Sequence, residues 1–115
     1  PLADSGVYED AIKAYNTMDS KYDCLLSVYE MHDYIFYNEK PVNFKPNPWP
    51  KSQDLSGVCA MSFVINILKR ADMVKWGSLV GNIPYFFYLD RITSLDIDFQ
   101  EDFDFCEMLY KQRHS

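Results

Sequence analysis

The sequence predicts a mainly α-helical fold, a compact bundle of five or six short helices with a proline-rich strap at 38–55. Hydrophobic residues make up 48% of the 115 residues and aromatic residues 17%, which is enough apolar material for one folded core. Apolar side chains recur at helical spacing through most of the chain, and the prolines of the strap interrupt that pattern. We therefore expect a single helical interaction domain over 1–115. Because it lacks an initiator methionine, we expect it to be excised from a longer chain.

The charge and the cysteines limit the partners and the compartment. The net charge of -6 repels phosphate backbones and anionic lipids, and the eleven Lys and Arg are scattered, so nucleic-acid and membrane partners are disfavoured. Cys24, Cys59 and Cys106 are far apart in apolar contexts, which is typical of free thiols in a reducing compartment. No signal-peptide pattern is visible, and no apolar run reaches about 18 residues. We expect an intracellular protein, in the cytoplasm or the nucleus.

Two helices are predicted in the first part of the chain, at 6–18 and 21–37. The first carries apolar residues at helical spacing, with Ser5 placed as its N-cap. In the second, the polar residues fall within one narrow arc of the helix, and the opposite side is apolar. That arc, which we expect to face water, contains Asp23, Ser27, Glu30 and Tyr34.

The middle of the chain is predicted to hold the strap and a buried helix. Four prolines make 38–55 an extended segment that crosses the core. The following stretch, 57–70, is apolar nearly all round and is expected to be the central buried helix. Asp72 can cap a short helix at 73–80, which Gly81 would end.

The stretch 83–92 has two interpretations. A helix is the first, but consecutive aromatic residues also suit a strand, and a short β-hairpin over 85–99 is the alternative. The last helix is predicted at 99–113, because acidic residues crowd its start and basic residues its end. Asp98 and Glu101 are expected to form its capping pair.

The chain offers few groups for catalysis. His32 lies in the middle of the apolar face of 21–37, where it would be a neutral core histidine bonded to a backbone carbonyl or a tyrosine hydroxyl. A small enzyme or metal site around His32 is a third hypothesis for function. The glycines form no phosphate-binding motif, and the acids near Asp98 lack calcium-loop spacing. We expect no enzyme activity, no cofactor, no bound metal and no small-molecule substrate.

Binding is the better prediction, because several elements carry more apolar surface than one packed face can cover. The leading hypothesis is a non-catalytic protein–protein interaction or regulatory module, which either homodimerises or binds a partner as an adaptor. Exposed aromatic and methionine side chains would anchor the contact. The residues predicted to bind the partner are Phe86, Phe87, Phe105, Met108 and Trp49.

A nucleic-acid-associated domain is the alternative hypothesis. The fold would then be α+β and winged-helix-like, with helices at 57–70 and 73–80 and a wing at 85–99. Binding would depend on Lys69, Arg70 and Lys75, against an adverse overall charge. The composition therefore favours the protein-binding module.

Overall fold

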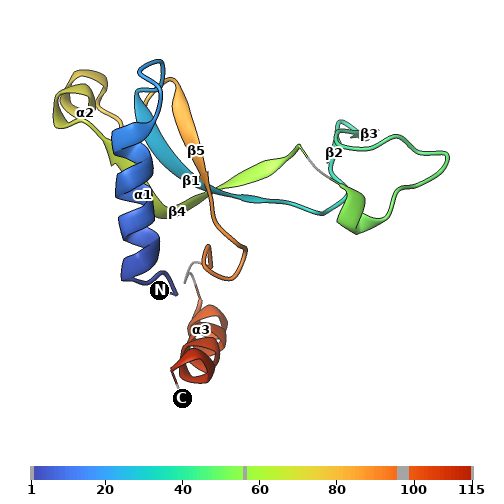
Figure 1. Ribbon diagram of the computed structural model, residues 1–115. Helices are drawn as coiled ribbons and strands as arrows, with labels where there is room; N and C mark the ends of the chain where they lie inside the picture. The colour runs from blue at the N-terminus through green and yellow to red at the C-terminus, as the bar shows by residue number, and fades with distance from the viewer. Residues whose placement is uncertain (1, 56, 96–98, 115) are drawn as a thin grey trace.

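A computed structural model describes residues 2–55, 57–95 and 99–114 (Figure 1). The described residues form three α-helices, a three-stranded sheet and a separate two-stranded sheet. The fold is therefore α+β, and the predicted bundle of five or six helices is wrong.

The main sheet has the strand order β4-β1-β5. Its middle strand, β1 (Cys24–Glu30), pairs antiparallel with β4 (Cys59–Leu68) and parallel with β5 (Pro84–Tyr88). Strands β1 and β4 fall in the segments predicted as helices, 21–37 and 57–70. Both strands carry apolar residues on their two faces, so their apolar pattern is nearly continuous and resembles that of a buried helix.

The stretch 83–92 contains the strand β5, so the helix predicted there is wrong. The aromatic run lies parallel to β1 and does not fold back as the predicted hairpin at 85–99, of which residues 96–98 lie outside the described residues. The winged-helix alternative is also wrong, because its helix-turn-helix requires a helix at 57–70, where β4 runs.

Helix α1 (Ser5–Thr17) confirms the helix predicted at 6–18. Its N-cap is Asp4 and not the predicted Ser5. The Asp4 carboxylate accepts a hydrogen bond from the backbone N–H of Val7 at 3.1 Å.

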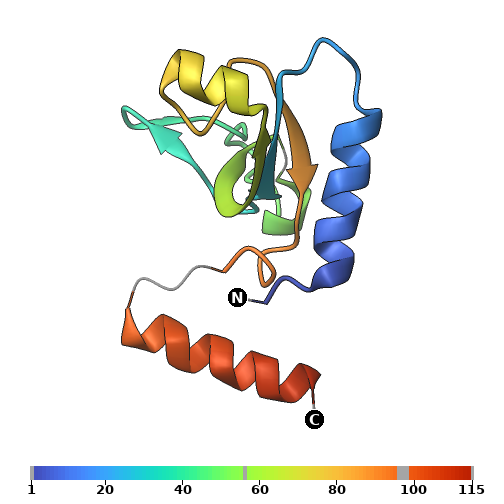
Figure 2. The ribbon, with the colours of Figure 1, turned by 90° about the vertical axis from the view of Figure 1, so that its left-hand side faces the viewer.

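The core lies between α1 and one face of the sheet (Figure 2). Ala11 of α1, Leu25 of β1 and Ile65 of β4 are buried together. Tyr85 and Phe87 of β5 pack against this cluster from the other side of β1. Helix α1 thus packs against all three strands and holds them together in one core.

Ser27 is the buried polar residue at the centre of the sheet. The pairing of β1 with β4 shifts between Leu26 and Val28, so that four residues of β4 bulge out opposite Ser27. The Ser27 hydroxyl donates to the carbonyl of Ser62 at 2.9 Å and accepts from the N–H of Ile65 at 3.0 Å. The prediction of a solvated position for Ser27 is wrong, because its side chain replaces ladder bonds that the bulge removes.

Helix α2 (Arg70–Trp76) begins before the helix predicted at 73–80. It ends at Gly77, which has φ +60, the left-handed conformation that glycine adopts without steric cost. The predicted end at Gly81 is therefore wrong.

Helix α3 (Gln100–Arg113) confirms the helix predicted at 99–113. The Asp102 carboxylate accepts a hydrogen bond from the backbone N–H of Phe99 at 3.1 Å, which is the capping role that was predicted for Glu101. The other predicted capping residue, Asp98, lies outside the described residues. Figure 2 shows α3 crosswise to α1 and apart from the sheet. Within the described ranges, no helix has both the length and the apolar character needed to cross a membrane.

Candidate protein-interaction arm

The chain between β1 and β4 forms an arm that projects away from the sheet (Figure 1). We define the arm as residues 31–55. It contains the two-stranded sheet of β2 (Phe36–Tyr37) and β3 (Lys40–Pro41), and the 3-10 turn η1 (Ser52–Asp54). The extended strap predicted at 38–55 lies in this arm, but it does not cross the core as expected.

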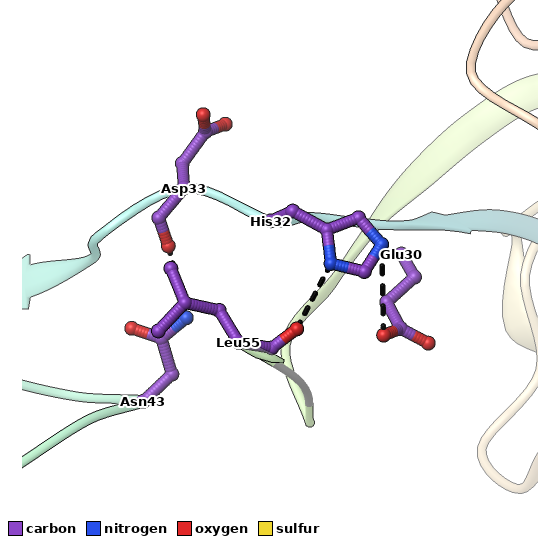
Figure 3. Close-up of polar contacts among 5 residues, drawn as sticks. All are labelled: Glu30, His32, Asp33, Asn43 and Leu55. Atoms are coloured by element: carbon purple, nitrogen blue, oxygen red, sulfur yellow. Dashed lines mark hydrogen bonds and ion pairs between the residues drawn. The ribbon is translucent and has the colours of Figure 1, made fainter. Parts of the chain in front are cut away.

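His32 fastens the base of the arm (Figure 3). Its Nδ1 lies 2.9 Å from the carbonyl oxygen of Leu55, and because a carbonyl only accepts, Nδ1 carries the proton. Its Nε2 lies 3.8 Å from the carboxylate of Glu30. The expected backbone carbonyl partner is present, but the buried position predicted for His32 is wrong, because the side chain is 53% exposed.

Asn43 ties the two limbs of the arm together further from the sheet. Its Nδ2 donates to the carbonyl of Asp33 at 2.9 Å, and its Oδ1 accepts from the N–H of Ile35 at 3.1 Å. The Ile35 carbonyl in turn accepts from the N–H of Val42 at 2.8 Å. The arm is therefore held by its own hydrogen bonds, although it leaves the sheet.

A tight turn joins β2 and β3 within the arm. Asn38 and Glu39 both have positive φ, 49° and 66°. Positive φ at both central residues is the conformation of a type I′ hairpin turn, where asparagine and glycine are favoured. Asn38 suits its position, and Glu39 adopts its own at a steric cost.

Four aromatic side chains from both limbs of the arm pack on one another. In five of their pairs the ring centroids lie 4.9–6.4 Å apart, and each of these pairs is edge-to-face or tilted. The Tyr34 hydroxyl also donates a hydrogen bond to the carbonyl of Pro50. We call these residues the aromatic cluster: Tyr34, Phe36, Phe44 and Trp49.

The aromatic cluster does not contribute to the described core, which lies between α1 and the sheet. Trp49 is 57% exposed, and Phe36 and the adjacent Tyr37 are exposed as well. A contiguous group of exposed apolar side chains is a common feature of interaction sites. The arm therefore presents apolar surface that no other described part of the chain covers.

The arm is electrically neutral on an acidic molecule. Residues 31–55 contain three lysines and three acidic residues, so the net charge of -6 belongs to the rest of the chain. An acidic partner is repelled by the acidic parts of the molecule more than by the neutral arm. The arm is thus a part of the surface where close contact meets little electrostatic resistance.

The five residues predicted to bind a partner lie on three separate elements. Trp49 belongs to the aromatic cluster, and Phe105 and Met108 are exposed on α3. Phe86 is exposed on β5, whereas Phe87 packs against the core and has no free face of comparable size. The structure does not bring these five residues into one surface.

Three members of the aromatic cluster were missed by the sequence prediction. The helix predicted at 21–37 placed Tyr34 on a solvated arc and Phe36 on the apolar face, and Phe44 was part of the strap. The signal that identifies them is a hairpin pattern, in which Tyr34 and Phe36 alternate along a limb that turns at Asn38.

The described residues provide little for reactive chemistry. They contain no group of three His, Cys, Asp or Glu side chains placed to hold a metal ion. Burial and the neighbouring Asp23 carboxylate raise the pKa of the Cys24 thiol, which keeps it protonated and unreactive. Comparison with protein-family models and with curated proteins found no match. The geometry of the arm is therefore the basis for a proposed function.

Proposed function

We propose that the protein is a non-catalytic protein–protein interaction module, an adaptor that binds a partner protein through its arm. The observation that carries this proposal is the aromatic cluster, which is ordered on a projecting arm and covers none of the described core. Aromatic side chains supply most of the energy at interfaces where they enter a partner's pocket.

The internal bonds of the arm support this role. His32 and Asn43 hold the two limbs together before any partner arrives. Because the arm is already ordered, binding costs less conformational entropy than the ordering of a flexible loop would. A pre-ordered aromatic surface is what an interaction module requires.

The chemistry of the arm indicates the kind of surface that it fits. The neutral arm is expected to enter an apolar groove, with its lysines at the polar rim of the contact. Affinity should then depend weakly on salt, because apolar burial is not screened as exposed charge pairs are.

The test is affinity capture from a native extract with three versions of the chain as bait. The wild type is compared with the double variant Phe36→Ala/Trp49→Ala, and with the control Phe63→Ala, which removes an exposed aromatic side chain of β4. A partner should be retained by the wild type and the control and lost by the double variant. Loss of anchor residues typically costs at least about 2 kcal/mol, or roughly 30-fold in affinity.

Circular dichroism and urea unfolding of each bait separate binding from folding. The double variant should keep the unfolding midpoint of the wild type, because the aromatic cluster lies outside the core. Capture of the same proteins by all three baits would refute the arm as the binding surface.

A further inference from the structure

Strand β5 leaves one side of its backbone unpaired. It pairs with β1, and no described strand pairs with its other side. The carbonyl of Ile83 and the N–H of Leu89, at its two ends, both bond to the segment of β1. Because backbone groups alternate in direction along a strand, those of Pro84, Phe86 and Tyr88 face outward.

This edge has little of the protection that exposed strands normally carry. Segment 84–89 contains no charged residue, and its pairing with β1 has no bulge. The opposite edge of the sheet is different, because β4 is interrupted by the bulge at Ser27. Charges, bulges and prolines keep edges from pairing, and β5 has only Pro84, at its first position. Its outward residues Phe86 and Tyr88 are 42% and 60% exposed.

The outward groups of β5 are complementary to a second copy of themselves. In an antiparallel pair about a two-fold axis at Phe86, the N–H and carbonyl of Phe86 meet the same groups of the second copy. Pro84 lacks an N–H and offers only its carbonyl, which falls opposite the N–H of Tyr88 in the second copy. The pairing therefore forms about four hydrogen bonds, and the missing donor of the proline affects only the Tyr88 carbonyl at the end of the strand.

We propose that two copies of this chain associate by pairing their β5 strands antiparallel, which joins their sheets into one. Helix α1 does not stand in the way, since it contacts all three strands from one face and leaves the edge free. The two Phe86 side chains would lie side by side on the opposite face, where aromatic cross-strand pairs stabilise a sheet. This inference does not depend on the arm, and failure of either proposal leaves the other standing.

The expected association is weak and depends on concentration. One short strand from each copy, with its flanking side chains, buries less than the roughly 1,600 Å² of a standard interface. A dissociation constant of micromolar order or weaker is therefore expected.

Sedimentation of the full chain between about 1 µM and about 1 mM tests the proposal. The wild type should shift from monomer to dimer within this range. Phe86→Lys, which places two like charges against each other across the axis, should raise the dissociation constant at least about tenfold. The control Phe63→Lys changes an exposed aromatic residue of β4 and should leave the constant unchanged.

A second measurement on the wild type holds even if Phe86→Lys does not fold. Amide hydrogen exchange of Phe86 and Tyr88 should slow as the concentration rises, whereas the amides of Tyr85 and Phe87, which face β1, should be protected at every concentration. A chain that stays monomeric over the whole range would overturn the proposal. Equal changes of the dissociation constant in Phe86→Lys and Phe63→Lys would overturn it as well. So would exchange rates of the Phe86 and Tyr88 amides that do not change with concentration.

Discussion

Replacing Ser27 with alanine removes a hydroxyl that two backbone groups of β4 depend on. The Ser27 side chain is fully buried, and it bonds to the carbonyl of Ser62 and the N–H of Ile65. In the alanine variant both groups are left in the interior without that partner.

The size of the effect follows from these two groups. A buried backbone donor or acceptor that loses its partner costs about 1–3 kcal/mol. The two costs overlap, since one local shift of the bulge can relieve both, so we expect a loss of about 2–4 kcal/mol in the free energy of unfolding. With a urea m-value of about 2 kcal/mol/M, the unfolding midpoint should fall by about 1–2 M.

Urea unfolding, followed by circular dichroism, measures this change. Ser78→Ala is the matched control, because the exposed Ser78 hydroxyl bonds locally to Val80 and its loss should cost no more than about 0.5 kcal/mol. If Ser27 lay on the solvated side of a helix, alanine would stabilise the protein by a few tenths of a kcal/mol or more. An unchanged or raised urea unfolding midpoint for Ser27→Ala would therefore refute the buried position of Ser27 in the sheet and at its bulge.

Three further changes probe other parts of the fold. Gly81→Ala should lower the unfolding free energy by about 1–3 kcal/mol, because the new Cβ would lie 2.8 Å from Cγ of Asp23. Gly6→Ala on α1 should not, because its new Cβ would meet only Asp4 Oδ1, at 3.4 Å, an ordinary van der Waals contact. Although partial burial opposes it, hydrogen bonds from two backbone N–H groups hold the pKa of Asp23 below its ordinary value. The stability from this lowered pKa is complete above the unfolded-state pKa of about 3.9 and is lost as the pH falls through the folded value, so Asp23→Asn should flatten the acid limb of a pH-unfolding curve. Glu39→Gly should relieve the positive φ of the hairpin turn and slow amide exchange in the arm about fivefold, or about 1 kcal/mol, whereas faster exchange would contradict the turn geometry.

The two terminal helices could be predicted because their signals are local. The apolar spacing of 6–18 and the charge gradient of 99–113 act within a few turns of each helix. The prolines of 38–55 also act locally, since each restricts its own backbone and that of its neighbour, but the predicted course of this strap across the core is wrong.

The strands of the main sheet could not be predicted, because their polar residues are explained only by distant contacts. Ser27 satisfies groups of Ser62 and Ile65, which lie far along the chain. In the sequence alone, a serine within an apolar run indicates a solvated position on a helix. The aromatic run of β5 is likewise a strand because β1 lies beside it, and single-sequence periodicity does not report that neighbour.

The candidate site was predicted in part. Trp49 is one of the predicted binding residues, and it lies 57% exposed in the aromatic cluster. Tyr34 and Phe36 were missed, because their grouping with Trp49 requires the chain to leave the sheet and return. Short-range patterns reveal exposed anchors one at a time, and only the fold shows which of them share a surface.

The central claim is that the arm serves binding and not the stability of the sheet. Its most direct test is the urea unfolding midpoint of a chain in which residues 34–53 are replaced by a flexible linker of about eight residues, with His32 and Leu55 kept. The sheet and α1 should unfold in one transition. The free energy of unfolding should equal that of the wild type or exceed it by no more than about 1 kcal/mol, because the shorter loop costs less entropy to close. A loss of more than about 2 kcal/mol, or failure to fold, would show that the arm is part of the core and contradict the account.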